Sequence, residues 1–317
     1  MSDTRKAAHH GEDKWDGDDY LNQEGMLEAS EANTRNVLAG LKAAGFPEDK
    51  LKSLNCLEIG SGPGAVTRHL LPLFGSVHSI DTSPSMLKTL SKQSFAQSDN
   101  LTWSLHALGA DTAAAFKTAL PSPKNGEDSS ATPPRDQFDV AISTLTVHHV
   151  DDTKSFFAGA KALLKPGGVL VICEFTKDAE GNDVLAALRE KYPEMAHGHA
   201  GSGQHDHGHD HKKETKGHEM HEGKHGGDSQ SKGHIHDRGH AHAHGHAHHD
   251  DKVQSVNAPG HFHPSFEIGD IRKMLQEAGF TDIEGGNGEP VVIPKFKEAI
   301  PCIWVFARKP GEGWKGD

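Results

Sequence analysis

Residues 57–70 read LEIGSGPGAVTRHL, and this stretch is the clearest indication of the fold class. Gly60, Gly62 and Gly64 alternate between an apolar run and the start of a helical pattern. Glycine has no Cβ, so a ligand can approach the backbone closely and a positive φ costs little. A helix that begins after such a turn offers free N–H groups at its first residues. The pattern predicts a strand, a turn and a helix with a ligand site at the turn, and a plain connecting turn is the alternative.

Strands and helices alternate between residues 54 and 175, which indicates an α/β fold with parallel crossover connections. Continuous runs of Val, Ile and Leu predict strands that are covered on both faces. The expected strands are 54–59, 76–80, 101–106, 138–145 and 169–175, and the expected helices are 25–45, 65–74, 84–94, 110–120, 153–164 and 181–191. In such a sheet the ligand crevice lies at the carboxyl ends of the strands, where the strand order reverses.

The rest of the chain is less regular. Residues 121–136 are rich in Pro and Ser and predict a loop, and KPGG at 165–168 predicts a turn. Order returns at 261–280, where a helix is expected to stop at Gly279. The last clear strand is expected at 299–308, with 290–294 as its partner.

A histidine-rich insert divides the expected domain into two segments of sequence. Residues 197–250 hold 17 of the 26 His and almost no apolar residues, so the insert, taken as 197–258, is expected to be disordered when free. We expect a flexible N-terminus over residues 1–24. A single α/β domain is then expected from two segments, 25–196 and 259–310.

Composition limits the function classes. The net charge is −12, which makes a nucleic-acid partner a poor expectation. Neither a signal peptide nor a membrane span is expected. The three cysteines, Cys56, Cys173 and Cys302, each lie in an apolar run and predict buried free thiols. These features favour a cytoplasmic protein, with the nucleus left open.

Asp81 ends the second expected strand, seventeen residues after Gly64. A carboxylate there can accept both hydroxyls of a ribose, although a helix N-cap is an equally ordinary role for a single Asp. Two cofactor classes fit. Gly60, Gly62 and Ala65 match the dinucleotide pattern G-x-G-x-x-G/A, which is weak by itself. Glu58 at the mouth disfavours a pyrophosphate and favours a ligand that carries an ammonium and a sulfonium.

Four blocks, LEIGSGPG (57–64), SIDTSPSML (79–87), FDVAISTLTVHHVDD (138–152) and LLKPGGVLVICEF (163–175), occur in order and at normal spacing. With them the chain resembles class I S-adenosylmethionine-dependent methyltransferases. Within that class it is similar to the small-molecule enzymes related to ubiquinone and menaquinone biosynthesis. The resemblance covers 54–175 strongly and 259–308 more weakly.

The resemblance implies a Rossmann-like, seven-stranded, mostly parallel sheet with an antiparallel last strand and helices on both faces. It implies that Glu58, Gly60, Ser61, Gly62 and Gly64 serve the methionine part of S-adenosylmethionine. Asp81 would hold the ribose, Thr82, Met86 and Leu108 would lie at the adenine, and Ser143 and Thr144 would lie near the sulfonium and the acceptor. The chain departs from the family after the third strand, where His106, Ala107 and Leu108 stand in place of the usual acid.

The acceptor side of the site is less specific. His148 and His149 are candidate general bases, needed only if the acceptor must lose a proton, and capping the loop before helix 153–164 is their alternative role. His261 and His263 are candidate acceptor-binding residues, or an extension of the insert. Trp15 and Tyr20 are candidates for a lid over the acceptor. Acidity and the missing motif of amino-methylating DNA enzymes favour a small-molecule acceptor.

Imidazoles are good ligands for zinc, nickel and copper. The candidate ligands in the insert are His205, His207, His209, His211, His240, His242, His244 and His246. They are expected to bind metal in many registers. The alternatives are an insert that responds to pH, an inert low-complexity expansion and a metal site that catalysis requires. Two other functions stay open: a methyltransferase-like binding or regulatory protein, and an NAD-dependent oxidoreductase, for which no hydride-transfer residue set is found.

Overall fold

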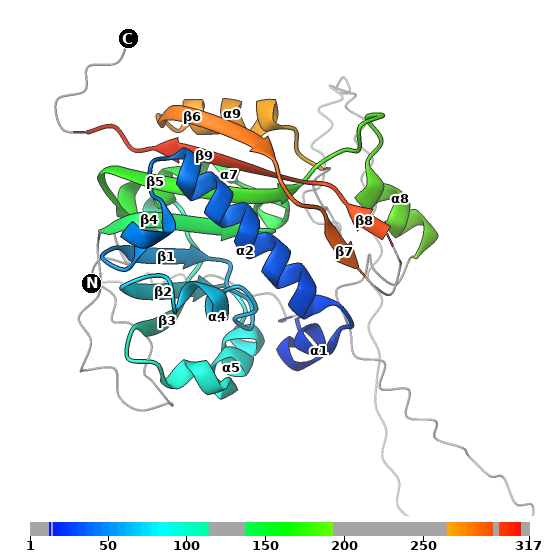
Figure 1. Ribbon diagram of the computed structural model, residues 1–317, viewed down its shortest axis with the longest axis horizontal. Helices are drawn as coiled ribbons and strands as arrows, with labels where there is room; N and C mark the ends of the chain where they lie inside the picture. Colours follow the sequence, from blue (N-terminus) through cyan, green and yellow to red (C-terminus); the bar gives the residue numbers. More distant parts are fainter. Residues whose placement is uncertain (1–12, 14, 114–136, 193–264, 294–297, 312–317) are drawn as a thin grey trace, which may run out of the picture. The chain divides into compact units, whose positions relative to one another are not determined.

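The computed structural model describes residues 13, 15–113, 137–192, 265–293 and 298–311 of the chain. A seven-stranded sheet lies at its centre, in the order β3-β2-β1-β4-β5-β9-β6 (Figure 1). The strands are β1 (Asn55–Ile59), β2 (Ser76–Asp81), β3 (Leu101–Leu105), β4 (Phe138–Thr144), β5 (Leu164–Phe175), β6 (Thr281–Asn287) and β9 (Cys302–Arg308). Strands β1 to β5 are parallel to one another, and β9 is antiparallel to both β5 and β6. The predicted fold class and its antiparallel last strand are confirmed.

Helices cover both faces of this sheet (Figure 1). The α-helices of the described structure are α1 (Gly17–Asn22), α2 (Met26–Ala43), α3 (Glu48–Leu51), α4 (Thr67–Leu70), α5 (Pro84–Lys92), α7 (Thr153–Leu163), α8 (Val184–Lys191) and α9 (Ile268–Glu277). Leu41 of α2 and Leu90 of α5 belong to the core on one face. Phe157 of α7 and Leu275 of α9 belong to the core on the other. The strand order reverses between β1 and β4, which is where an α/β sheet opens a crevice for a ligand.

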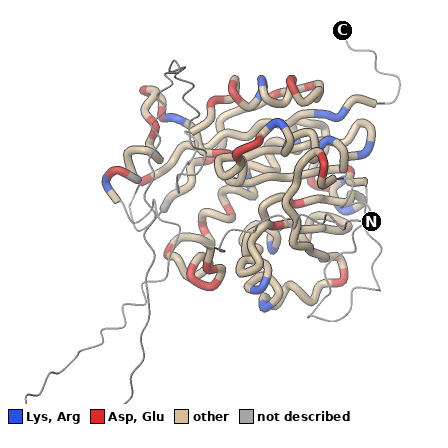
Figure 2. The backbone as a smooth tube through the Cα atoms, turned by 180° about the vertical axis from the view of Figure 1, so that it is seen from behind, with Lys and Arg blue, Asp and Glu red and all other residues tan. Residues whose placement is uncertain are grey.

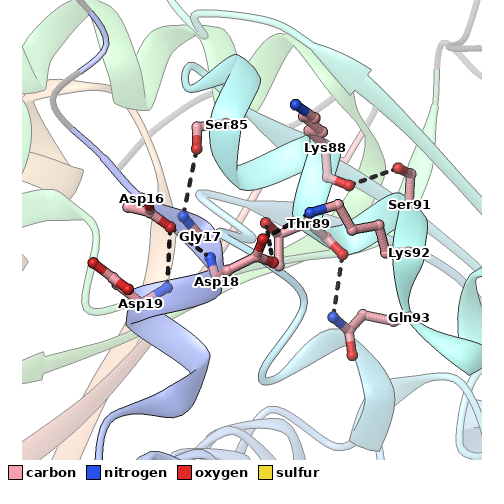
Figure 3. Close-up of polar contacts among 10 residues, drawn as sticks. All are labelled: Asp16, Gly17, Asp18, Asp19, Ser85, Lys88, Thr89, Ser91, Lys92 and Gln93. Atoms are coloured by element: carbon pink, nitrogen blue, oxygen red, sulfur yellow. Dashed lines mark hydrogen bonds and ion pairs between the residues drawn. The ribbon is translucent and has the colours of Figure 1, made fainter. Parts of the chain in front are cut away.

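Helix α1 lies inside the N-terminal segment that was expected to be flexible. Asp16 caps it by accepting hydrogen bonds from the N–H groups of the next two acidic residues, Asp18 and Asp19. Figure 3 shows α1 facing α5, where Asp18 accepts hydrogen bonds from Thr89 Oγ1 at 2.9 Å and Lys92 Nζ at 2.7 Å. These contacts join segments about seventy residues apart, which is why local sequence signals do not predict the helix.

Two local predictions differ from the structure. The helix expected over 65–74 is limited to α4, and Pro72, which has no N–H to donate, follows its C-terminal end. The turn expected at 165–168 is part of β5, which starts with an irregular segment. Gly167 has a φ of +79° there and donates its N–H to the carbonyl of Lys309. The glycine thus bends a paired strand and does not end it.

The C-terminal region is the least well predicted part of the fold. Strand β6 follows α9 directly and was not expected. The strand expected over 299–308 divides at Pro301 into β8 (Glu298–Ile300) and β9. The expected partner, 290–294, contributes β7 (Val291–Ile293), which pairs antiparallel with β8 in a separate two-stranded sheet. Gly279 ends α9 as predicted, with a φ of +75°.

Other predictions lie partly or wholly outside the described residues. Residues 110–113 are helical, and the rest of the helix expected to 120 is outside. The loop 121–136 and the insert 197–258 are outside as well. The three cysteines are free and buried, as predicted. Across the described parts of the chain, no helix has both the length and the apolar surface that crossing a bilayer requires.

Candidate active site

A cavity of about 310 Å³ opens at the carboxyl ends of β1, β2 and β4, beside the point where the strand order reverses. Nine of the residues selected from the sequence line it: Trp15, Tyr20, Gly60, Gly62, Asp81, Thr82, Met86, Leu108 and His149. Its volume lies in the range of small-molecule sites, and most of its lining is apolar or aromatic.

The glycine turn brings the backbone to the cavity wall. Gly60 and Gly62 have φ angles of +73° and +54°, which side-chain-bearing residues rarely adopt. The N–H groups of Gly60 and Ser61 both bond to the carbonyl of Ile80, so the turn is fastened to β2. A Cβ on Gly62 would have only Met86 Sδ, at 3.9 Å, within 4 Å. The turn therefore leaves open space for a ligand against the backbone at Gly62.

Asp81 is the lone carboxylate in the described lining of the cavity. Its Oδ2 accepts the N–H of Gly62 at 2.7 Å and its Oδ1 accepts the N–H of Ser83 at 2.8 Å. Burial raises the pKa of Asp81, while these backbone hydrogen bonds oppose the rise. Each carboxylate oxygen keeps lone-pair capacity after one hydrogen bond. Asp81 can thus accept further hydrogen bonds from a ligand diol.

The cavity walls on either side of Asp81 are apolar. Ile59, Ile80, Met86 and Leu108 are part of the lining, and they suit the flat apolar faces of an adenine ring. At the end of β3 the lining consists of His106, Ala107 and Leu108, so the described wall carries no acid there. The donor and acceptor set of the cavity thus fits an adenosine whose ribose bonds to Asp81.

The N-terminal segment forms one side of the cavity through Trp15 and Tyr20. Asp13 fastens this segment to the start of α5, where it accepts hydrogen bonds from Ser83 Oγ at 2.9 Å and the Ser85 N–H at 2.8 Å. Burial raises the pKa of the Tyr20 hydroxyl, and the nearby Asp81 carboxylate raises it further. The two aromatic residues expected to form a lid therefore lie at the cavity, next to its carboxylate.

The remaining selected residues, at the end of β4 and just after it, differ in whether they reach the cavity. His149 lies on the wall, where its ring meets Trp15 edge to face with 5.4 Å between ring centroids. His148 is buried and bonds to Glu174. Ser143 and Thr144 are not part of the lining, and within the described structure their buried hydroxyl oxygens have no hydrogen-bond partner. The two adjacent histidines therefore have different surroundings.

Glu58 lies behind the glycine turn and not on the cavity wall. Its Oε2 accepts hydrogen bonds from Thr67 Oγ1 at 2.6 Å and Ser79 Oγ at 2.7 Å, which ties α4 to β2. Burial raises its pKa from 4.5 to about 7, although both hydrogen bonds act in the opposite direction. Ser61 and Gly64 also lie outside the lining of this cavity. Glu58 therefore supports the turn from the side away from the cavity.

Glu58→Gln is expected to change how stability depends on pH. A raised pKa means that the folded protein keeps a proton that the unfolded chain loses. The stability from this group is complete below pH 4.5 and is lost as the pH rises through about 7. The free energy of unfolding of Glu58→Gln, relative to the parent, should rise by about 3 kcal/mol between pH 4.5 and pH 8. Urea unfolding at both pH values measures this, and a constant difference would contradict it.

Several selected residues cannot be located in the described structure. His261 and His263 lie outside it, as do the eight candidate metal ligands between His205 and His246. In the described ranges no group of three or more His, Cys, Asp or Glu is arranged to hold a metal ion. Sequence reasoning missed the lining residues Leu145, Thr146, Val150 and Phe156 and the buried Glu174. Their position directly after β4, in α7 or at the end of β5 was the one available signal.

Comparison with known proteins identifies the family. Residues 31–284 match the family described as a methyltransferase domain. Because this match covers well over half of the chain, the protein belongs to that family.

Individual relatives agree with the family. Demethylmenaquinone methyltransferase from Tropheryma whipplei is 30% identical over 120 residues, which cover 38% of this chain and 41% of that protein. Ubiquinone biosynthesis O-methyltransferase from a Bradyrhizobium species is 26% identical over 137 residues, which cover 41% and 46%. The chain thus spans less than half the length of these curated relatives.

Solved structures give a distant likeness. The N-methyltransferase NodS from Bradyrhizobium japonicum, in complex with S-adenosyl-L-homocysteine, has 13% identity and a TM-score of 0.45, with 95% of this chain and 94% of that chain covered. A Burkholderia thailandensis 1,6-didemethyltoxoflavin-N1-methyltransferase has 14% identity and a TM-score of 0.44, with 92% and 81% covered.

Proposed function

We propose that the protein transfers a methyl group from S-adenosylmethionine to a small-molecule acceptor in the cavity beside the glycine turn. The observation that carries the proposal is the Asp81 carboxylate on the cavity wall, next to the open backbone at Gly62. Family membership and the names of the curated relatives, which refer to menaquinone and ubiquinone methylation, support it.

S-adenosylmethionine, when bound, supplies a methyl group on a positively charged sulfonium. The chain's own residues then have three tasks. Asp81 holds the ribose hydroxyls, and the apolar residues around Met86 and Leu108 enclose the adenine. Trp15 and Tyr20 exclude water and present aromatic faces, which attract cations. Alignment of the acceptor with the methyl group provides most of the acceleration.

His149 is the proton acceptor in this proposal. It lines the cavity, whereas His148 is turned toward Glu174. An acceptor that carries a hydroxyl or an ammonium must lose a proton, and an imidazole accepts it near neutral pH. The cavity volume and the dispersion of Lys and Arg among acidic residues, seen in Figure 2, favour a small molecule over a nucleic acid.

Calorimetric titration of S-adenosylmethionine into chelator-stripped, full-length protein tests the proposal. We expect a dissociation constant in the micromolar range without added metal. Absence of binding with and without zinc would contradict the proposal and favour a binding or regulatory protein.

We also infer that the histidine-rich insert binds zinc, nickel or copper without one fixed geometry. The density of imidazoles in residues 197–250 is the observation that favours it. Titration of zinc alone into the stripped protein should show several weak sites. If S-adenosylmethionine binds only after zinc is added, the insert controls the cavity, and metal has a role in cofactor binding.

A further inference from the structure

We propose that Glu174 is a positioning residue that fixes the position of the His149 side chain on the cavity wall. This inference rests on the proposed function, because His149 is its proton acceptor. Glu174 lies near the end of β5 and is completely buried. Within the described structure, the Glu174 carboxylate bonds to Val147 and His148, which do not line the cavity, so it acts through the segment that follows β4.

Both oxygens of the Glu174 carboxylate bond to that segment. Its Oε1 accepts the N–H of Val147 at 2.6 Å, and its Oε2 lies 2.8 Å from Nδ1 of His148. A carboxylate acceptor requires that Nδ1 carries a proton, so neutral His148 has its lone pair on Nε2. A buried carboxylate with two donors in place is a costly arrangement to break, because it would leave a buried charge unpaired.

His148 links Glu174 to His149, because its ring packs against the ring of His149. The two imidazole rings are 4.0 Å apart between centroids, at an angle of 47°. The His148 ring also packs against Phe175, with 5.7 Å between ring centroids. His149 in turn meets Trp15 across the cavity wall. Glu174, His148, His149 and Trp15 therefore form a continuous series of contacts from the core to the cavity.

The backbone of the segment is held in an unusual conformation. Leu145 has a φ of +50°, a left-handed conformation that a residue with a side chain rarely adopts. Its N–H bonds to the carbonyl of Cys173 at 2.8 Å, and Thr146 Oγ1 bonds to the carbonyl of Ile59 at 3.3 Å. Such a conformation persists only where the surroundings fix it. After the bonds to Cys173 and Ile59, the two bonds to Glu174 are the third connection between this segment and the sheet.

The amide of Glu174→Gln separates this role from simple packing. Glutamine has almost the same shape, but it offers one oxygen acceptor and one NH₂ donor. It can satisfy Val147 or the Nδ1–H of His148, and not both. Glu174→Asp keeps two acceptors on a shorter side chain and is the matched control.

Two measurements on the full-length protein test the proposal. ¹⁵N NMR of the imidazoles, with His148→Asn to assign the signal, should show the Nδ1–H tautomer in the parent and in Glu174→Asp. It should be lost or mixed in Glu174→Gln. The fluorescence of Trp15, taken as the difference from Trp15→Phe, should change in Glu174→Gln and return toward the parent in Glu174→Asp. A parent-like tautomer and parent-like Trp15 fluorescence in Glu174→Gln would overturn the proposal.

A third measurement separates this proposal from the proposed function. The dissociation constant of S-adenosylmethionine should rise by less than about tenfold in Glu174→Gln, far less than in Asp81→Ala, because Glu174 does not touch Asp81. If the parent does not bind S-adenosylmethionine, the proposed function fails, while the NMR and fluorescence results still decide the role of Glu174. A large loss of binding in Glu174→Gln alone would overturn its assignment to the acceptor side.

Discussion

Asp81→Ala is expected to weaken the binding of S-adenosylmethionine by at least about 100-fold, because it removes the charged acceptor proposed for two hydrogen bonds from the ribose. A hydrogen bond to a charged group contributes about 1.5–3 kcal/mol. The substitution also releases the N–H groups of Gly62 and Ser83, which the carboxylate holds at 2.7 and 2.8 Å. Both effects act in the same direction, and calorimetric titration measures their sum.

Two variants separate the ribose contacts from general damage. Asp81→Asn keeps one oxygen acceptor and should lose less affinity than Asp81→Ala. Asp139→Asn is the matched control, since Asp139 also accepts a backbone N–H, from Asn55 at 2.9 Å, but does not line the cavity. Its affinity should remain within about twofold of the parent. Equal affinity in Asp81→Ala and the parent would show that the cofactor binds elsewhere.

The core of the fold was predictable because its signals are local. The alternating glycines at 60, 62 and 64 indicate a turn, and the buried strands around it consist of continuous apolar runs. The order β3-β2-β1-β4 then follows from right-handed crossovers once the family resemblance is recognised.

Strand β6 was hidden by its glycines. A Cβ on Gly286 would lie 2.6 Å from the Trp304 ring, and one on Gly285 would lie 2.8 Å from Cγ2 of Ile268. Glycine is a poor strand former and normally indicates a turn. Gly286 leaves room for the Trp304 ring of the neighbouring strand β9, and a single sequence does not reveal that contact.

The candidate site was predictable to the extent that its residues lie in the family's blocks. Gly62, Asp81 and Met86 line the cavity, and their contact with a cofactor stays a prediction. Glu174 was missed because its partner His148 is 26 residues away, on the segment after the neighbouring strand. Its role depends on the pairing of β4 with β5, in which Thr144 lies opposite Cys173.

Gly60→Ala is expected to lower the free energy of unfolding by about 3 kcal/mol, because a side chain is added in a positive-φ conformation and in a filled space. The φ of Gly60 is +73°, and a Cβ there would lie 2.9 Å from Cβ of Thr146 and still closer to its Oγ1 and Cγ2. Either Thr146 or the turn must move, and Thr146 holds the carbonyl of Ile59. Urea unfolding measures the loss, and binding of S-adenosylmethionine should be lost with it.

Gly45→Ala isolates the conformational part of this effect. Gly45 has a φ of +86°, and a Cβ there would meet no atom of the described residues within 4 Å. It should therefore cost only about 1–2 kcal/mol. In a double-mutant cycle, Gly60→Ala with Thr146→Ala should be less unstable than the two single changes predict, since Oγ1 and Cγ2 are gone. Additive costs would mean that the crowding at Thr146 does not determine the need for glycine at position 60.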